Sequence, residues 1–238
     1  MKAKNFEERL RQYQFHPVVP FEGTDKLLLL DFTDKNKELT PDILNNTSLF
    51  IKYINSKLQT SDAIYGIGGY NEHRTIYDRS RLFDSENGEE PRRLHLGIDI
   101  WGKPYTYVMA PLDGIVHSFA FNNLLGDYGA TIILSHRLED FSFYTLYGHL
   151  SLNSLKNLQV GNSIKKGDVF TEFGIPFENG QWPPHLHFQI ILDMEGMEGD
   201  YPGVCKYSER EKYLSNCPDP DLILDMMKNV EGISKVTG

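Results

Sequence analysis

Three short stretches carry histidine within runs that have β-strand character, and together they could build a metal site. They are "HLGID" (95–99), "YGHLS" (147–151) and "PPHLH" (183–187). In an extended chain, side chains two residues apart point to the same face, so His185 and His187 are neighbours about 6.6 Å apart. The run around them, "HLHFQIIL", is otherwise apolar. Two imidazoles on one face of such a strand are weak evidence alone, but together with the other two stretches they favour a metal site.

The first stretch can supply an imidazole and a carboxylate to one ion only if the chain bends. On a straight strand His95 and Asp99 would share a face but lie roughly 13 Å apart. Gly97 stands between them, and glycine tolerates the backbone angles of a bend or bulge. Imidazole nitrogen and carboxylate oxygen are both ordinary ligands of zinc, at about 2.0–2.2 Å.

A catalytic zinc usually has three protein ligands and one open position. The third ligand can come from "HLH", which leaves the other imidazole beside the metal as an acid, a base or a hydrogen-bond donor. Spacing alone does not distinguish the two. The chain has no H-E-x-x-H, which excludes the common helical zinc-protease site. The other strand and loop histidines are expected to be ordinary core or surface residues: His16, His73, His117 and His136.

The segment from about 95 to 192 is predicted to be a β structure, because short β-rich runs alternate there with turn signals. No long helical pattern interrupts them, which favours a compact antiparallel sandwich or barrel-like domain. The runs are "YTYVMA" (105–110), "GIVHSFAF" (114–121), "ATIILSH" (130–136), "FSFYTLYGHL" (141–150), "SIKKGDVFTEFG" (163–174) and "HLHFQIIL" (185–192).

The flanking segments predict a strand and two helices. "DKLLLLDFT" (25–33) is typical of a buried strand, and residues 40–58 repeat apolar side chains at helical spacing, with Thr40 as N-cap. Residues 201–218 are expected to be loop, and a short closing helix is expected to follow, with Asp219 as its cap and Pro220 in its first turn.

We therefore predict a mainly β fold in three parts. Residues 1–60 form an N-terminal strand-helix extension packed on the core, residues 61–200 the β domain, and residues 201–238 a C-terminal extension with a short helix.

Composition and charge exclude several functions. The 238 residues contain 33 acidic and 24 basic side chains, for a net charge of −9, which argues against nucleic acid and anionic membranes as partners. The amino terminus lacks the apolar region of a signal peptide, and no run is long enough to cross a membrane. We expect a cytoplasmic protein, or an exported one if a signal has been removed, with Cys205 and Cys217 as free thiols.

Residues from about 95 to 192 resemble the lysostaphin or LytM-type zinc metallopeptidases of the duplicated hybrid motif class. That family carries H-x-x-x-D, then a lone histidine in a "YxHLS"-like stretch, then H-x-H in a "PHLHFQI"-like stretch. Here these are "HLGID", "LYGHLS" and "PPHLHFQI", and "APLDGIV" (110–116) and "VGNSIKKGDV" (160–169) are also similar. The resemblance covers roughly two fifths of the chain.

The resemblance implies that His95, Asp99 and His187 bind one zinc ion and that His149 and His185 lie beside it without binding. It implies an endopeptidase that hydrolyses peptide bonds, in peptidoglycan-type peptides, by a zinc-activated water whose proton transfers the two histidines perform. Zinc lowers the pKa of water towards about 7, and an imidazole of pKa near 6.5 is suited to the proton transfers.

Two segments depart from the family pattern. The loop "FGIPFENGQWPP" (173–184) is bulkier than usual and carries Trp182, and "GIGGYNEHRTIYDRSRLF" (66–83) is longer and more charged. We expect the first to narrow the substrate cleft. Tyr70, Arg74 and Trp182 are candidate substrate contacts, although Arg74 is also explained as a solvated surface residue.

Three alternatives stay open at this level. Residues 201–224 resemble the sequence after such domains in large cytoplasmic proteins that also hold an aminotransferase-like domain, so the substrate could be a small peptide unrelated to cell wall. A biotinyl, lipoyl or phosphocarrier domain has a similar β pattern, but no suitable modifiable lysine is found, and "HLGID" favours a metal. A non-catalytic regulator is the third alternative, although such relatives typically lose ligands and here all five positions are filled.

Overall fold

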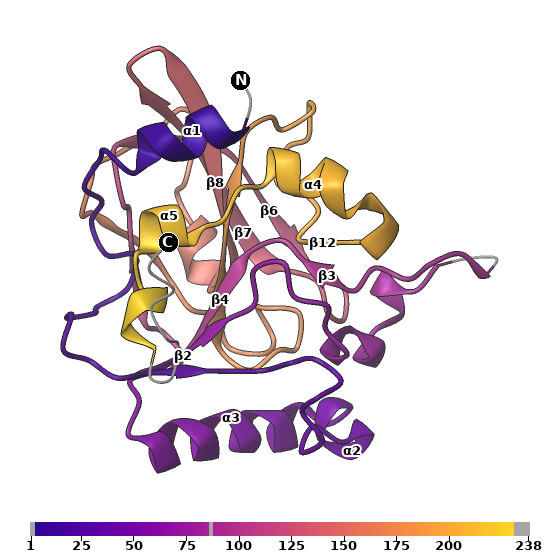
Figure 1. The fold of residues 1–238 in the computed structure, drawn as a ribbon. Coiled ribbons are helices and arrows are strands. Elements are labelled where there is room, and N and C mark those ends of the chain that lie inside the picture. Colours follow the sequence, from indigo (N-terminus) through magenta and orange to yellow (C-terminus); the bar gives the residue numbers. More distant parts are fainter. Residues whose placement is uncertain (1–2, 86–87, 231–238) are drawn as a thin grey trace.

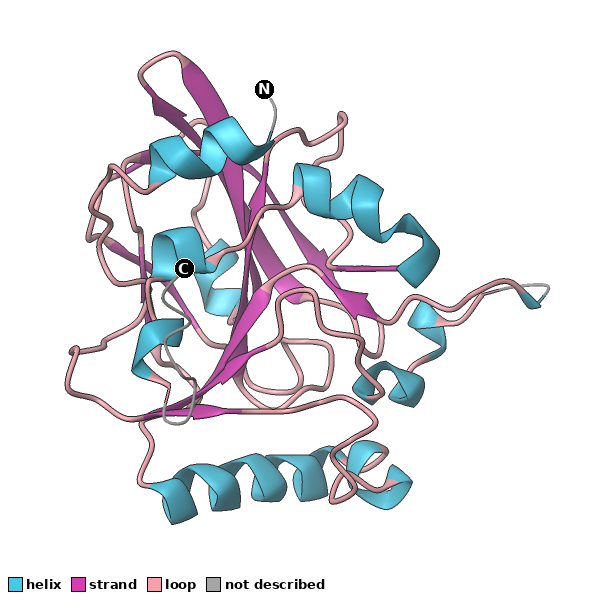
Figure 2. Cartoon of the chain, viewed as in Figure 1, coloured by secondary structure: helices cyan, strands magenta, loops and turns pink. Residues whose placement is uncertain are grey.

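The computed structural model describes residues 3–85 and 88–230, and one large mixed sheet lies at its centre (Figures 1 and 2). All neighbouring strands of this sheet are antiparallel except β1 and β2, which are parallel. In spatial order the strands are β1 (Leu27–Leu29), β2 (Tyr65–Gly68), β4 (Ile98–Trp101), β11 (His185–Ile191), β8 (Phe141–Leu150), β7 (Gly129–Leu138), β6 (Gly114–Asn122) and β9 (Ser163–Ile164).

Two small antiparallel sheets complete the β structure. One pairs β5 (Tyr107–Met109) with β10 (Val169–Glu172), and the other pairs β3 (Leu94–His95) with β12 (Val204–Cys205). The mainly β fold class predicted from the sequence is confirmed.

The large sheet is covered on both faces, which explains why its central strands are almost continuously apolar. Successive residues of β7 point to opposite faces. Accordingly, Ile132 and Leu134 pack in one hydrophobic cluster, whereas Ile133 packs with Leu146 in another. All four side chains are fully buried. The sheet is therefore a rigid support for side chains placed on its strands.

The helix predicted over 40–58 is two helices. Thr40 caps α2 (Pro41–Leu44) as predicted, but the chain is extended at Asn46, and α3 (Thr47–Ser61) begins after it. The Asn46 side chain accepts hydrogen bonds from the backbone N–H groups of Ser48 and Leu49, and asparagine is among the best N-caps. A cap signal inside the apolar pattern thus ends one helix and starts another. α3 lies beneath the β2 edge of the sheet in Figure 1.

The remaining helices are short. Pro220, rather than Asp219, is the N-cap of α5 (Asp221–Leu224), while the Asp219 carboxylate accepts the N–H of Asp221. α1 (Ala3–Leu10) was not predicted, and α4 (Arg210–Asn216) replaces an expected loop. Single 3₁₀ turns are η1 (Ile76–Arg79), η2 (Arg81–Phe83), η4 (Leu152–Leu155), η5 (Tyr207–Glu209) and η6 (Met227–Asn229).

The predicted terminal extensions each contribute a strand to the β structure. β1 comes from residues 1–60 and joins the large sheet, and β12 comes from residues 201–238 and pairs with β3. The division into three parts at 60 and 200 stays a prediction. Cys205 and Cys217 are both buried free thiols, as expected.

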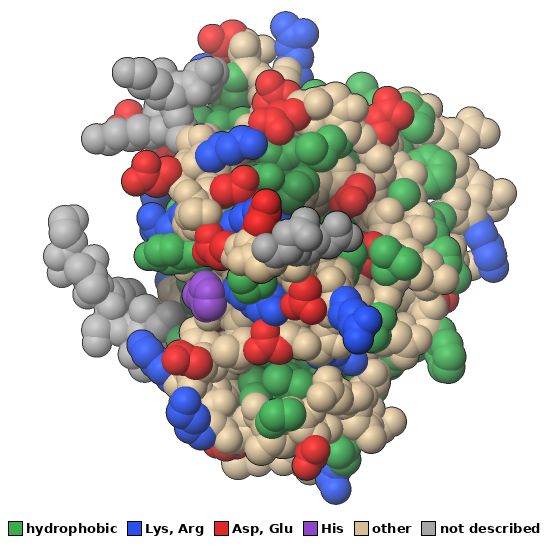
Figure 3. Space-filling view, turned by 90° about the vertical axis from the view of Figure 1, so that its right-hand side faces the viewer, with side chains coloured by type: hydrophobic (Ala, Val, Ile, Leu, Met, Phe, Trp, Pro, Cys, Tyr) green, Lys and Arg blue, Asp and Glu red, His purple; other side chains and the backbone are tan. Residues whose placement is uncertain are grey.

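Helix length and surface charge are the features of the molecule that bear on contact with membranes and charged molecules. None of the helices within 3–85 and 88–230 has the length and hydropathy needed to cross a bilayer. On the face drawn in Figure 3, acidic and basic side chains are interspersed.

Candidate metal centre and active site

The chain bends between β3 and β4, at Gly97, and this bend brings the first two candidate ligands together. β3 ends at His95 and β4 begins at Ile98, so the chain does not run straight between His95 and Asp99. A Cβ atom on Gly97 would lie 2.5 Å from Cε1 of His187 and 2.8 Å from the backbone oxygen of Phe188. Such contacts are too close for any side chain, so this position requires glycine for the approach of β11.

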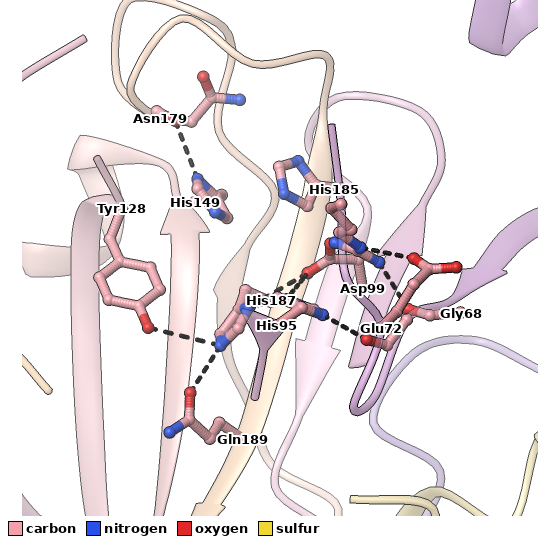
Figure 4. A network of polar contacts seen from close by, with 12 residues as sticks. Gly68, Glu72, His95, Asp99, Tyr128, His149, Asn179, His185, His187 and Gln189 are labelled. Atoms are coloured by element: carbon pink, nitrogen blue, oxygen red, sulfur yellow. Dashed lines mark hydrogen bonds and ion pairs between the residues drawn. The ribbon is translucent and has the colours of Figure 1, made fainter. Parts of the chain in front are cut away.

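Pairing between β4 and β11 supplies the third candidate ligand, because His187 lies opposite Asp99 in register. Nε2 of His95 is 2.9 Å from Nδ1 of His187, and Oδ1 of Asp99 is 3.3 Å and 3.1 Å from these two nitrogens (Figure 4). Ligand atoms of a tetrahedral zinc with bonds of 2.0–2.2 Å lie about 3.4 Å apart. The three atoms thus have nearly the spacing that one zinc ion needs.

Hydrogen bonds on the far side of each ring determine which nitrogens face this centre. Nδ1 of His95 donates to the backbone oxygen of Gly69 over 2.9 Å, which leaves a lone pair on Nε2. Nε2 of His187 donates to Oε1 of Gln189 over 2.9 Å, which leaves a lone pair on Nδ1. The Gln189 amide is held in this orientation because its nitrogen donates to the oxygen of Pro202.

Three electron-pair donors therefore converge without a proton between them. Two imidazole lone pairs and a carboxylate oxygen repel one another unless a cation lies among them. His95, Asp99 and His187 are also 97% or more buried, so water does not relieve this repulsion. The residues fit a divalent metal of the zinc type.

Arg74 holds the other side of the Asp99 carboxylate. Its guanidinium pairs with Oδ2 of Asp99 and donates to Glu72 over 2.7 Å and to the oxygen of Gly68 over 3.1 Å (Figure 4). Burial alone would raise the pKa of Asp99, but His95, Arg74 and His187 lower it well below its usual value. The explanation of Arg74 as a solvated surface residue is wrong, because its side chain is completely buried.

His149 and His185 lie side by side next to this centre. Their rings stack with centroids 4.0 Å apart, and His185 also stacks on Trp101 at 3.8 Å. Nδ1 of His149 donates to the oxygen of Asn179, and Nδ1 of His185 to that of Pro183. Each ring thus keeps a lone pair on Nε2, for which no hydrogen bond is found within the described residues.

Burial keeps both of these rings neutral. It lowers the pKa of His185 to about 4 and that of His149 well below its ordinary value, and the nearby imidazoles add to the effect on His149. His149 has a backbone φ of 65°, a left-handed conformation that is uncommon outside glycine. Strain of this kind is found where the surrounding structure holds a side chain in a required direction.

The five residues line one cavity of about 150 Å³. Trp182 contributes to its wall from the loop 173–184, as predicted, and Tyr77 and Phe83 contribute from η1 and η2, within the long segment 66–83. The cavity lining does not include Tyr70, whose hydroxyl donates to the backbone oxygen of Cys217. Arg92, Asp127 and Asp200 also line the cavity, and no motif in the sequence had marked them.

The comparison with protein families matches the same part of the chain. Residues 93–198 match the model described as "Peptidase family M23". The predicted resemblance of this segment to lysostaphin- or LytM-type peptidases is thereby confirmed. The M23 segment contains all five residues just described.

One curated relative and two solved structures illustrate the similarity. An "Uncharacterized metalloprotease" of Haemophilus influenzae is 32% identical over 102 residues, which are 42% of this chain and 19% of that relative. The catalytic domain of lysostaphin from Staphylococcus simulans is 22% identical and covers 68% of this chain and 97% of its own, with a TM-score of 0.39. Full lysostaphin is 24% identical and covers 73% and 55%, with a TM-score of 0.41.

Proposed function

We propose that this protein is a zinc-dependent metalloendopeptidase whose zinc is held by His95, Asp99 and His187, one ion per chain. The observation that carries the proposal is the convergence of three unprotonated donor atoms, 2.9–3.3 Å apart, in the wall of a cavity. The match of this segment to a peptidase family supports the same conclusion.

Zinc would supply the Lewis acidity, and the residues of the chain would hold and orient it. A zinc ion at this position supplies Lewis acidity, which polarises a peptide carbonyl and makes water acidic enough to lose a proton near neutral pH. Asp99, held by Arg74 on its far oxygen, presents a single oxygen to the ion. Gln189 fixes the tautomer of His187.

His149 and His185 perform the proton transfers. Both are neutral near pH 7 and both keep a lone pair on Nε2 beside the metal centre, so either can accept the proton of the attacking water. Once protonated, the same imidazole can donate to the leaving amine or to the oxygen on which negative charge develops. The fixed Nδ1–H bonds to backbone oxygens keep each ring pointed at the cavity.

We further propose peptidoglycan-type peptides as the substrate, by analogy with the family. A second candidate is a short peptide outside the cell wall, and the size of the cavity favours it. Ligand sites usually measure 300–1,000 Å³, whereas this cavity has about 150 Å³. The contact of Asp99 with both His95 and His187 argues against a phosphocarrier, which would need facing histidines without a carboxylate.

The test combines metal analysis with hydrolysis. Purified wild-type protein and His149→Ala are analysed for zinc and assayed for peptide release from purified cell walls and from a soluble stem peptide. We expect about one zinc per chain in both proteins and a 10²- to 10⁴-fold loss of activity in His149→Ala, the usual contribution of a general acid or base. Loss of zinc from that variant would contradict the assignment of His149.

His187→Ala serves as the matched control on the same strand, and it should lose the metal. Zinc-loaded protein that leaves cell walls intact but cleaves the soluble peptide would favour the second substrate class. Protein that binds zinc and cleaves neither would refute the enzyme proposal.

A further inference from the structure

Two carboxylates at the catalytic cavity have no ionic partner. Asp127 and Asp200 both line the cavity; Asp127 is half-buried and Asp200 is exposed. Among the side chains of residues 6–85 and 88–230, no lysine or arginine nitrogen lies within 4 Å of either carboxylate. Oδ1 of Asp127 accepts a hydrogen bond from the backbone N–H of Tyr128 over 2.8 Å.

The chain holds these carboxylates in a fixed relation to the metal centre. The hydroxyl of Tyr128 donates to the backbone oxygen of Tyr201 over 3.2 Å, so the residues that follow Asp127 and Asp200 are tied together. The same hydroxyl lies 3.5 Å from Nε2 of His187 (Figure 4). Although the Asp200 residue is exposed, the surrounding chain removes part of the hydration of both carboxylates and raises their pKa, and Asp200 raises that of Asp127 further. A cation bound beside the two carboxylates would stabilise their ionised forms and so lower the pKa of both.

Arg92 only partly offsets the charge of the pair. It lines the same cavity and lowers the pKa of both aspartates, but its guanidinium donates to the backbone oxygen of Leu82 and forms no ion pair within the described residues. Two carboxylates and one guanidinium give a net charge of −1. This net charge favours a substrate whose positive group lies beside Asp127 and Asp200.

The same cavity is lined by two imidazole nitrogens that have no hydrogen-bond partner within the described residues. His149 and His185 are 6% and 2% exposed, and their Nε2 atoms have no hydrogen-bond partner within the described part of the chain. These two nitrogens open onto the cavity rather than into the packed chain, so a ligand in the cavity can reach them. The carboxylates are therefore part of a site that already has a place for a polar reacting group, rather than an isolated acidic surface.

The small volume limits what can enter. A cavity of about 150 Å³ holds one or two residues around the scissile bond. A short peptide carries its terminal and side-chain charges close to the scissile bond. Because of this short distance, its amino group can reach the wall of the cavity.

We propose that Asp127 and Asp200 bind a protonated amino group of a short peptide substrate and so determine specificity. The proposal rests on the peptidase function given above, which it deepens. The amino group can be the α-amino terminus or the side-chain amine of a lysine-like residue, because both present the same ammonium chemistry.

The probe is the pentapeptide L-Ala-γ-D-Glu-L-Lys-D-Ala-D-Ala in three forms: free, Nα-acetylated, and acetylated only on the lysine side chain. Hydrolysis is followed with the zinc-loaded full chain, and binding is measured by calorimetry with the His149→Ala protein. We expect acetylation of one of the two amines to raise Kd at least tenfold, about 1.4 kcal/mol. The amine that matters identifies the source of the ammonium group.

The variant is Asp127→Asn/Asp200→Asn, which should abolish this preference while binding the acetylated peptide as the parent does. Asp34→Asn/Asp62→Asn removes two exposed carboxylates that do not line the cavity and should leave the preference unchanged. Thermal unfolding of each variant checks the fold.

The outcomes separate the two proposals. Hydrolysis of all three peptides with equal kcat/KM would overturn the specificity proposal and leave the peptidase function standing. Amine-dependent binding without hydrolysis by the zinc-loaded wild type would support the specificity proposal and refute the peptidase function. Absence of binding up to millimolar peptide, or a preference that survives in Asp127→Asn/Asp200→Asn, would also overturn the specificity proposal.

Discussion

Replacing Gly97 with alanine should damage the metal centre without changing the identity of any ligand. The added Cβ would lie 2.5 Å and 2.6 Å from Cε1 and Nε2 of the His187 ring, and 2.8 Å from the backbone oxygen of Phe188. Neither neighbour can move freely, because the ring donates to Gln189 and the Phe188 backbone is part of β11. The strain must therefore displace His187 or separate β11 from the chain at Gly97.

The magnitude follows from the known cost of overpacking, which is about 1–3 kcal/mol. We expect the free energy of unfolding of the metal-free protein to fall by about 2 kcal/mol, and the zinc Kd to rise at least tenfold because the His187–Gln189 hydrogen bond is disturbed. Gly97 has no positive φ, so backbone strain adds nothing to this figure.

The assay is chemical denaturation of the metal-free protein, together with competition for zinc against a chromophoric chelator. Gly23→Ala is the matched control, because no atom lies within 4 Å of its added Cβ. That variant should keep its zinc affinity and change in stability by less than about 1 kcal/mol. Gly97→Ala with wild-type stability and wild-type zinc affinity would refute the packing argument.

Three further predictions concern residues behind the site and in the core. Gln189→Leu removes the acceptor that holds His187 in its tautomer and should weaken zinc binding 10- to 100-fold, measured by the same competition; unchanged affinity would show that the tautomer needs no support. Arg74→Met leaves the buried Asp99 carboxylate and the half-buried Glu72 carboxylate without their cation and should cost the metal-free protein about 3–5 kcal/mol of unfolding free energy, with part restored by zinc; a loss under 1 kcal/mol would contradict this. Burial lowers the pKa of His136 to about 4, so the unfolded chain binds this proton more readily, and the stability present above about pH 6.5 is lost as the pH falls through 6.5 towards 4. Between pH 8 and pH 5 the loss from this group is about 2 kcal/mol, and denaturation curves should show that His136→Gln loses less stability over that interval than the wild type.

Local patterns were sufficient to predict the strands but not every helix. The runs from 105 to 192 each contain a strand, because alternation and turn residues are properties of a few neighbouring positions. The helix over 40–58 was predicted as one element because its apolar spacing continues through Asn46, and the cap that interrupts it has a weaker signal than the pattern around it. α4 was expected as loop, since its short sequence has no pronounced periodicity.

The supporting residues of the site could not be predicted from spacing. Arg74 and Gln189 hold Asp99 and His187, and Asp127 and Asp200 line the same cavity from other loops. None of them stands at a motif spacing from the ligands. Arg74 in particular looks like a surface residue in the sequence, because its only unusual property, complete burial beside two carboxylates, arises from contacts between distant segments.

The sequence by itself determined the chemical types: two imidazoles on one face of a strand, an imidazole and a carboxylate around a glycine, and a further histidine between them. It could do so because side-chain direction in a strand alternates with a period of two residues. Only the tertiary structure decided which nitrogens face the centre, how closely the donors approach, and how small the cavity above them is. These properties depend on contacts and strand pairing between distant residues, such as His95 and His187, 92 positions apart, which no local pattern encodes.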